Sequence, residues 1–278
     1  MPLETSKQML LEARGDGYAV CAFNIENLEM AQAVLDAAEE MEAPVILQTT
    51  PSTLRYAAPA AFAAMVGALT AQVSVPVALH LDHGDNVPLV AQALTAGFTS
   101  AMIDGSALSF DENVALTQEA VRLVGWRIPV EGELGRVGGK EDDLEAESGA
   151  YTDPEEAARF VQLTGVDSLA IGIGTSHGYY TEAPKLNFAR LSEIRRMVNV
   201  PLVLHGASGL TDEDLRKCIV RGVCKVNFAT ELRAAYTEGV KQALRDDPEL
   251  FDPKEFGVVG KRYVKEFAMT KIALCLGD

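Results

Sequence analysis

Short apolar runs alternate with amphipathic stretches along the whole chain. Eight such runs are rich in β-forming residues and recur roughly every 25 to 35 residues. They are largely continuous rather than alternating in polarity, which is typical of parallel strands buried on both faces. The predicted strands cover residues 18–25, 44–50, 76–83, 100–106, 128–134, 168–174, 201–205 and 225–230.

Helices are predicted between the strands. Residues 28–38 place apolar side chains at helical spacing on one face. Asp153 and Pro154 predict the start of a helix that runs to Thr164, because proline is tolerated in a first turn. A last helix over residues 254–274 follows the eighth strand.

Eight β/α units predict a closed barrel. In a chain of 278 residues they favour an α/β fold of the (β/α)8 TIM-barrel type over a doubly wound sheet, with an additional C-terminal helix. No linker or shift in composition divides the chain, so residues 1–278 are expected to form a single domain. Residues 137–150 are expected to form a long, glycine-rich and charged loop.

Charge and composition exclude several classes of protein. The formal net charge of −16 argues against binding to nucleic acid or to an anionic membrane, which requires a basic patch. No apolar run approaches the ~18 residues of a membrane span, and residues 1–11 do not resemble a signal peptide. The four cysteines, Cys21, Cys218, Cys224 and Cys275, lack CxxC spacing and indicate reduced thiols in a cytoplasmic protein.

All four histidines of the chain are predicted at or just past the C-terminal ends of strands. They are His80, His83, His177 and His205. In a TIM barrel these ends form the active-site face. A single histidine is more often structural, but several converging imidazoles favour a divalent metal, and three protein ligands with one open position are typical of catalytic zinc.

Carboxylates accompany the histidines. Asp82 precedes His83, where it could serve as an acid or base or could orient a ligand histidine. Glu131 and Glu133 alternate with Gly132 on the fifth strand, so that one of them could touch the metal or a polar network in the barrel mouth.

Three turns on the same rim could hold phosphate. Residues 172–178, 205–209 and 227–230 lie at the C-terminal ends of predicted strands, and two of these turns lead into helices. Backbone N–H groups in such turns and at helix N-termini favour anions, and phosphate sites after strands seven and eight recur in TIM barrels. Arg233 is either a cation near this site or a solvated residue.

Five motifs occur in an order that resembles a known family. They are His80-Leu81-Asp82-His83-Gly84, Glu131-Gly132-Glu133-Leu134-Gly135, Gly174-Thr175-Ser176-His177-Gly178, His205-Gly206-Ala207-Ser208-Gly209 and Lys225-Val226-Asn227. Together they resemble the class II, zinc-dependent fructose/tagatose-bisphosphate aldolases over essentially the whole chain. Residues 204–210 and 229–232 are most similar to the tagatose-bisphosphate branch.

The resemblance implies an activity and a metal. The expected reaction is reversible cleavage of a ketose 1,6-bisphosphate to dihydroxyacetone phosphate and glyceraldehyde 3-phosphate through a zinc-stabilised enediolate. It implies one zinc ion per subunit, bound by His83, His177 and His205, and leaves room for a monovalent cation. Asp82 is expected to deprotonate the C4 hydroxyl, and Glu141 to exchange the C3 proton from a mobile loop.

The resemblance also implies substrate contacts. His80 is expected to support the zinc ligands, and Glu133 to lie near the zinc or at an alternative metal position. Asn24 and Ser52 are expected near the substrate, and Arg233 near the distal phosphate. The residues expected at the dihydroxyacetone phosphate end are Gly178, Gly206, Ser208, Asn227 and Thr230.

The sequence departs from the family pattern at two places. Thr181 and Glu182 stand where many fructose-type members have a lysine, and Lys140 precedes Glu141 where some members have an acidic residue.

The expected partners are a phosphorylated sugar, further copies in a homodimer or homotetramer, and in some cases a non-catalytic partner subunit. The alternatives are an aldolase for another ketose phosphate, a different metal-dependent barrel enzyme, or a scaffold without catalysis.

Overall fold

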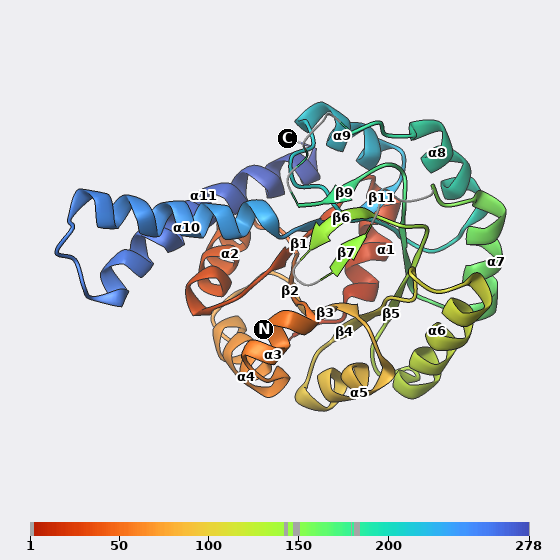
Figure 1. Cartoon of the computed structure of the whole chain (residues 1–278), viewed down its shortest axis with the longest axis horizontal. Coiled ribbons are helices and arrows are strands. Elements are labelled where there is room, and N and C mark those ends of the chain that lie inside the picture. The colour runs from red at the N-terminus through yellow and green to blue at the C-terminus, as the bar shows by residue number, and fades with distance from the viewer. Residues whose placement is uncertain (1–2, 142–143, 147–150, 179, 181–183, 278) are drawn as a thin grey trace.

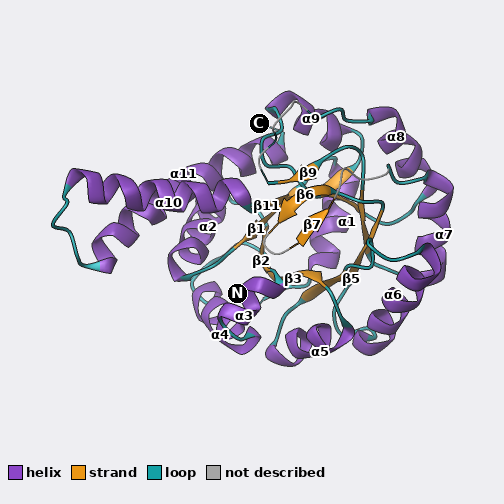
Figure 2. Cartoon of the chain, in the orientation of Figure 1, coloured by secondary structure: helices purple, strands orange, loops and turns teal. Residues whose placement is uncertain are grey.

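Eight parallel strands close into a barrel at the centre of the molecule. The computed structural model describes residues 3–141, 144–146, 151–178, 180 and 184–277. The barrel order is β1-β11-β10-β8-β5-β4-β3-β2, and helices surround it (Figures 1 and 2). This confirms the predicted TIM barrel, and each predicted run overlaps one strand, although β3 ends one residue later than predicted and β11 begins two residues earlier. The strands are β1 (Val20–Asn24), β2 (Val45–Thr49), β3 (Val77–Gly84), β4 (Ser100–Ile103), β5 (Val130–Leu134), β8 (Ser168–Ile171), β10 (Leu202–Leu204) and β11 (Val223–Phe228).

Most of the outer helices begin at a residue whose side chain caps the helix. The carboxylate of Asp153 accepts from the backbone N–H groups of Glu155 and Glu156, so the predicted helix start at this point is confirmed. The surrounding helices are α2 (Leu28–Glu40), α3 (Pro51–Tyr56), α4 (Pro59–Thr70), α5 (Val87–Ala96), α6 (Phe110–Val124), α7 (Pro154–Thr164), α8 (Phe188–Met197) and α9 (Asp212–Val220), and α10 (Thr230–Asp246) follows β11. Among the described residues, no helix is both long and apolar enough to cross a membrane.

The first helix, α1 (Ser6–Asp16), closes the N-terminal end of the barrel. Its buried side chains Met9, Leu10 and Ala13 form a cluster with barrel residues that include Val20 and Ile46. This apolar cluster fills the space inside the barrel next to α1.

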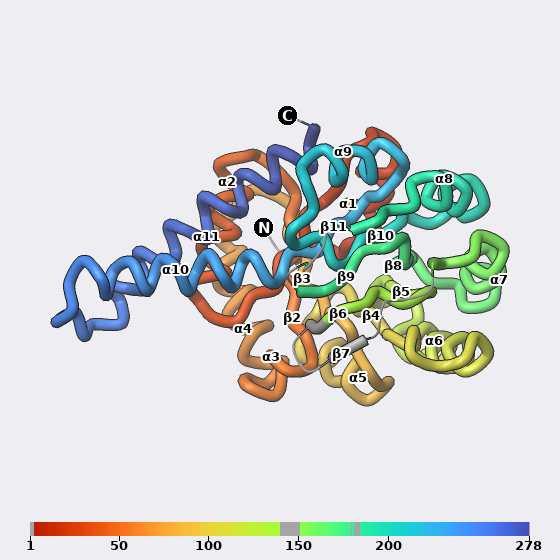
Figure 3. Tube along the Cα trace, turned by 45° about the horizontal axis from the view of Figure 1, so that its top comes forward, coloured from red at the N-terminus to blue at the C-terminus, as the bar shows by residue number. Residues whose placement is uncertain are grey.

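The last two helices form an arm that extends away from the barrel (Figures 1 and 3). Helix α11 (Pro253–Leu276) packs against α10 and against α2, and it includes the predicted last helix. The two helices of the arm approach closely where glycines meet. A Cβ atom on Gly239 would lie 2.8 Å from the Cα atom of Gly260.

A small second sheet lies over the mouth of the barrel (Figure 1). Strands β6 (Gly138–Glu141) and β7 (Leu144–Ala146) form an antiparallel hairpin, and β6 pairs in parallel with β9 (Ser176–His177). The segment 137–150, which was predicted to be a loop, therefore contains two short strands. The hairpin carries no apolar alternation, so hydrophobic pattern could not reveal it.

Candidate active site

The end of β3 turns two adjacent side chains toward one site. Neighbouring residues of a regular strand face opposite sides of the sheet. His83 instead has a φ angle of 48°, and the pairing of β3 with β4 shifts between Leu81 and Gly84. Such a backbone conformation costs on the order of 1–3 kcal/mol and persists where the surroundings enforce it. The absence of a side chain at Gly84 allows this close approach to β4, since a Cβ atom there would lie 2.5 Å from the carbonyl oxygen of Met102.

Three histidines converge at the rim of the barrel. His83 comes from β3, His177 from β9, and His205 directly follows β10. Their ring centroids lie 5.1 Å apart for His83 and His177, 4.6 Å for His83 and His205, and 6.0 Å for His177 and His205. One ring nitrogen of each lies within 4.8 Å of the others. The sequence predicted these three side chains together, and the fold brings them together.

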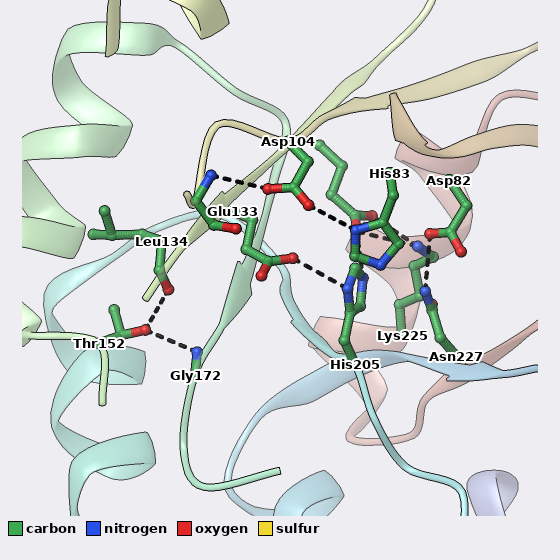
Figure 4. Close-up of polar contacts among 12 residues, drawn as sticks. Asp82, His83, Asp104, Glu133, Leu134, Thr152, Gly172, His205, Lys225 and Asn227 are labelled. Atoms are coloured by element: carbon green, nitrogen blue, oxygen red, sulfur yellow. Dashed lines mark hydrogen bonds and ion pairs between the residues drawn. The ribbon is translucent and has the colours of Figure 1, made fainter. Parts of the chain in front are cut away.

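Two carboxylates flank the histidines (Figure 4). Oδ2 of Asp104 lies 2.8 Å from Nδ1 of His83, and Oδ1 of Asp104 accepts from the backbone N–H of Ser106 at 2.9 Å. Burial alone would raise the pKa of Asp104, but contact with His83 and these hydrogen bonds hold it well below the usual range. Asp104 therefore fixes the orientation of the His83 ring.

The second carboxylate leaves a buried polar pair unsatisfied. Oε2 of Glu133 lies 3.2 Å from Nδ1 of His205, yet neither atom makes a hydrogen bond of acceptable geometry with the described residues. Burial by itself lowers the pKa of His205, but the carboxylates of Glu131 and Glu133 outweigh it and raise the pKa to about 9. Imidazole nitrogens with a nearby carboxylate oxygen are the donor set that zinc prefers, so these residues fit a cation.

A fully buried carboxylate lies beside the histidines. Oδ2 of Asp82 accepts from the amide groups of Asn24 at 2.9 Å and Gln48 at 3.0 Å. Oδ1 accepts from the amide of Asn227 at 3.1 Å. Three strands thus hold one carboxylate. Gln48 was not predicted, although a polar residue inside the apolar run 44–50 was a usable signal.

A charged network lies deeper in the barrel. Lys225 bonds both oxygens of Glu131, at 2.9 and 3.2 Å, and Nε2 of His205 lies 3.1 Å from Glu131. Lys225 and His205 hold the pKa of Glu131 low although burial opposes this. His80 lies within β3 rather than at its end, because β3 continues to Gly84.

His80 is buried below the rim. Its Nδ1 lies 2.7 Å from Oγ of Ser100, and its Nε2 lies 4.0 Å from Glu131. Burial, followed by the charge of Lys225, lowers its pKa well below the usual range. It therefore touches the carboxylate that holds His205, not the cluster of three histidines.

The predicted phosphate turns lie on the same rim. Gly178 and Gly206 have positive φ angles of 81° and 65°, and Ser208 is buried. Thr230 is the first residue of α10, so it stands at a helix N-terminus, where backbone N–H groups favour anions. Asn227 faces Asp82 across the barrel.

One tyrosine that the sequence did not single out joins two of these turns. The hydroxyl of Tyr180 accepts from the backbone N–H of Ser176 at 2.9 Å and donates to the carbonyl of Gly206 at 2.7 Å. Gly206 must be a glycine, because a Cβ atom there would lie 2.6 Å from the carbonyl oxygen of Ser176. The turn that carries His177 is thereby fixed to the turn that carries His205.

The remaining predicted residues lie further out or outside the described parts. Arg233 lies 3.8 Å from a carboxylate oxygen of Glu26. The hydroxyl of Ser52, at the start of α3, is 3.2 Å from that of Thr50. Glu141 ends β6, but its side chain, with that of Lys140, falls outside the described residues, as do Thr181 and Glu182.

Comparison with known proteins identifies the family. A family model described as class II fructose-bisphosphate aldolase matches residues 4–277. The chain belongs to the class II fructose-bisphosphate aldolase family. Membership makes it an aldolase, a carbon–carbon lyase that acts on phosphorylated ketoses, in a family whose members are generally zinc-dependent.

Solved aldolase structures agree with this assignment. The YdjI aldolase of Escherichia coli K12 is 39% identical, with a TM-score of 0.88, over 99% of this chain and 98% of that one. A protein from Coccidioides immitis assigned as a fructose-1,6-bisphosphate aldolase is 31% identical, with a TM-score of 0.90, over 99% and 97%. The fructose-bisphosphate aldolase of Campylobacter jejuni, 22% identical over 99% and 95%, shares the fold with a TM-score of 0.84.

Proposed function

We propose that this class II aldolase reversibly cleaves tagatose or fructose 1,6-bisphosphate to dihydroxyacetone phosphate and glyceraldehyde 3-phosphate with the help of one zinc ion. The observation that carries the proposal is the convergence of His83, His177 and His205 beside the buried carboxylate of Asp82. A metal and a base next to each other are what cleavage of a bond beside a carbonyl requires.

The three histidines would hold the zinc. In support, Asp104 orients His83, and a buried nitrogen of His205 lies against an unsatisfied oxygen of Glu133. Carboxylates that orient ligand histidines in this way raise metal affinity about 10–100-fold. When bound, the zinc supplies Lewis-acid stabilisation of the negative charge that develops on the substrate. Glu133 would offer an alternative ligand.

Asp82 would take the proton from the C4 hydroxyl as the C3–C4 bond breaks, and would return it in the condensation direction. The amide groups of Asn24, Gln48 and Asn227 hold both oxygens of this carboxylate, so little reorganisation is needed when the substrate arrives. Asn24 thus acts through Asp82, close to the substrate.

Glu141 would exchange the proton at C3. Its strand β6 pairs with β9, where Gly139 stands opposite His177, and Glu141 lies two residues further on. The hairpin over the mouth of the barrel is therefore suited to carry a second acid/base group to the substrate and to exclude water there.

The rim turns would bind the two phosphates. Gly178, Gly206, Ser208, Asn227 and Thr230 would hold the dihydroxyacetone phosphate end, with the N-terminus of α10 supplying part of the positive potential. Arg233, three residues into the same helix, would meet the distal phosphate, with Ser52 near the substrate. Because the protein has a net charge of −16, which repels an anionic substrate, such local donors are necessary.

The test is cleavage of fructose and tagatose 1,6-bisphosphates by the purified protein. These sugars differ only in the configuration at C4, the carbon whose hydroxyl Asp82 would deprotonate, so the ratio of the two rates identifies the substrate. Triose phosphate release is expected to stop with a chelator and to return with added zinc. Zinc-loaded protein that releases no triose phosphate from either sugar would contradict the proposal.

A further inference from the structure

A cavity opens at the end of the barrel opposite the histidine rim. Its volume is about 940 Å³, and α1 and the C-terminal ends of α7 and α8 line it. The N-terminal face of a TIM barrel normally serves stability rather than catalysis. A cavity of this size nevertheless falls in the ~300–1,000 Å³ range of small-molecule sites.

The charge of this cavity is opposite to that of the protein. Arg14, Arg195 and Arg196 line it, and none of the described lining residues is acidic. The chain as a whole has 40 acidic and 24 basic residues, so an acid-free wall with three guanidinium groups departs from the composition. Burial, and then the positive charge of Arg195, lower the pKa of Arg14, as expected where cations lie close together without an anion.

Helix capping accounts for only part of this cluster. Arg14 donates to the carbonyl of Val198, the C-cap residue of α8, at 3.2 Å. Arg14 stands in the last turn of α1, and Arg195 and Arg196 stand in the last turn of α8, where basic residues are favourable. Arg195 and Arg196, however, make no hydrogen bond or ion pair with any residue in the described part of the chain.

Arg195 is also held in place. Its side chain crosses Gly222, where a Cβ atom would lie 2.4 Å from Cδ and 2.5 Å from Nε of the arginine. Gly222 has a φ angle of 105°, so its backbone already favours glycine. The guanidinium group is therefore positioned by packing, as in a preformed site.

We propose that this cavity binds a small molecule that bears a diphosphate group. Guanidinium groups recognise phosphoryl oxygens with paired, charge-assisted hydrogen bonds, and Arg195 and Arg196 have donors to offer. Beside them the wall is apolar, with Ala158, Val161 and Met197, and this wall suits a flat organic ring. A nucleoside diphosphate has both the diphosphate group and the ring, whereas inorganic pyrophosphate has only the diphosphate group.

The experiment measures binding of ADP and of inorganic pyrophosphate to the purified protein by titration calorimetry. Saturable 1:1 binding is expected for wild type. Arg195→Ala and Arg196→Ala are each expected to weaken it about tenfold or more, since each removes one charged partner. Arg262→Ala, on the arm, removes the same charge elsewhere and should leave binding unchanged. Unchanged aldolase activity in each variant shows that the fold is intact.

Two further variants locate the ligand. Ser208→Ala, at the histidine rim, should leave ADP binding unchanged, because the proposed site lies at the other end of the barrel. Ala158→Phe fills the apolar side of the cavity. If a nucleotide is the ligand, this variant should weaken the binding of ADP more than that of pyrophosphate. If the ligand is inorganic, it should change the binding of both only slightly. No binding at millimolar concentration, binding indifferent to both arginine variants, or binding lost in Ser208→Ala would overturn the proposal.

Discussion

At the scale of the residue, the positions of Asp82 and His83 show how one short segment can supply two kinds of chemistry. Left-handed backbone at His83 lets consecutive side chains share a site. The conformation is enforced from both sides, by the Asp104 contact and by the close approach of Gly84 to β4. Residues with such strain are a common feature of functional sites.

Asp82→Ala is expected to lower the turnover number for bisphosphate cleavage about 10²–10⁴-fold, the usual contribution of a general acid or base. Zinc content should stay the same, because the proposed zinc ligands are the three histidines and Asp82 is not one of them. Steady-state kinetics and metal analysis of the same preparation test this. The control is Asp36→Ala, which removes an exposed carboxylate paired with Lys261. Equal loss of zinc and activity in Asp82→Ala would instead assign a metal-holding role.

Tyr180→Phe is expected to lower the free energy of unfolding by about 1–2 kcal/mol at neutral pH, because the hydroxyl joins the two histidine-bearing turns. Burial raises the pKa of Tyr180 to about 12, against about 10 in an unfolded chain. The folded protein thus keeps a proton that the unfolded chain loses first.

The pH dependence of this difference has a fixed sign. The advantage of wild type over Tyr180→Phe should be complete below pH 10 and should shrink as the pH rises through 12. Denaturant titrations of both proteins at pH 8 and pH 11 measure it. An advantage that is constant or grows with pH would show that the hydroxyl is not held in its protonated form.

At the scale of the element, apolar pattern was enough to predict the barrel. Its strands are buried on both faces, so most of them are largely apolar runs, and Asp153 starts α7 as expected. The hairpin β6–β7 escaped prediction because it is short and polar, and its strands form through backbone pairing over the barrel mouth.

The site was predictable where a residue type is rare and was missed where it is common. Four histidines in 278 residues attract attention, and three of them converge. Gln48 and Asp104 gain their importance only from partners on other strands, at 3.0 Å from Asp82 and 2.8 Å from His83. Such contacts depend on barrel register, which a single sequence does not reveal.

The arm offers a matched test of helix packing. Gly239→Ala should lower the free energy of unfolding by about 1–3 kcal/mol, since the new methyl group would meet the backbone of α11 at 2.8 Å. Gly67→Ala in α4 has nothing within 4 Å and should raise stability by about 0.5–1 kcal/mol. Urea titrations of both variants measure this. Equal effects would show that α10 and α11 do not pack closely in solution.

At the scale of the whole molecule, metal binding and stability are expected to be linked. A ligand that binds only the folded state adds about 4 kcal/mol at a thousand times its Kd, so removal of zinc by a chelator should lower the melting temperature and added zinc should restore it. Differential scanning calorimetry of wild type and His205→Ala tests this. The variant should respond to neither treatment, and a full zinc response in His205→Ala would contradict the three-histidine site.

The order of strands around the barrel has a consequence for biosynthesis. β1 pairs with β11, and α11 packs against α2. Elements near the N-terminus, which are synthesised first, therefore gain these contacts only after elements near the C-terminus have been synthesised. Until β11, which ends at Phe228, has been made, the growing sheet keeps two open edges, which are sites of unwanted pairing between chains. A nascent chain stalled before β11 would therefore depend on chaperones, and closure of the barrel is expected to be a late event in synthesis.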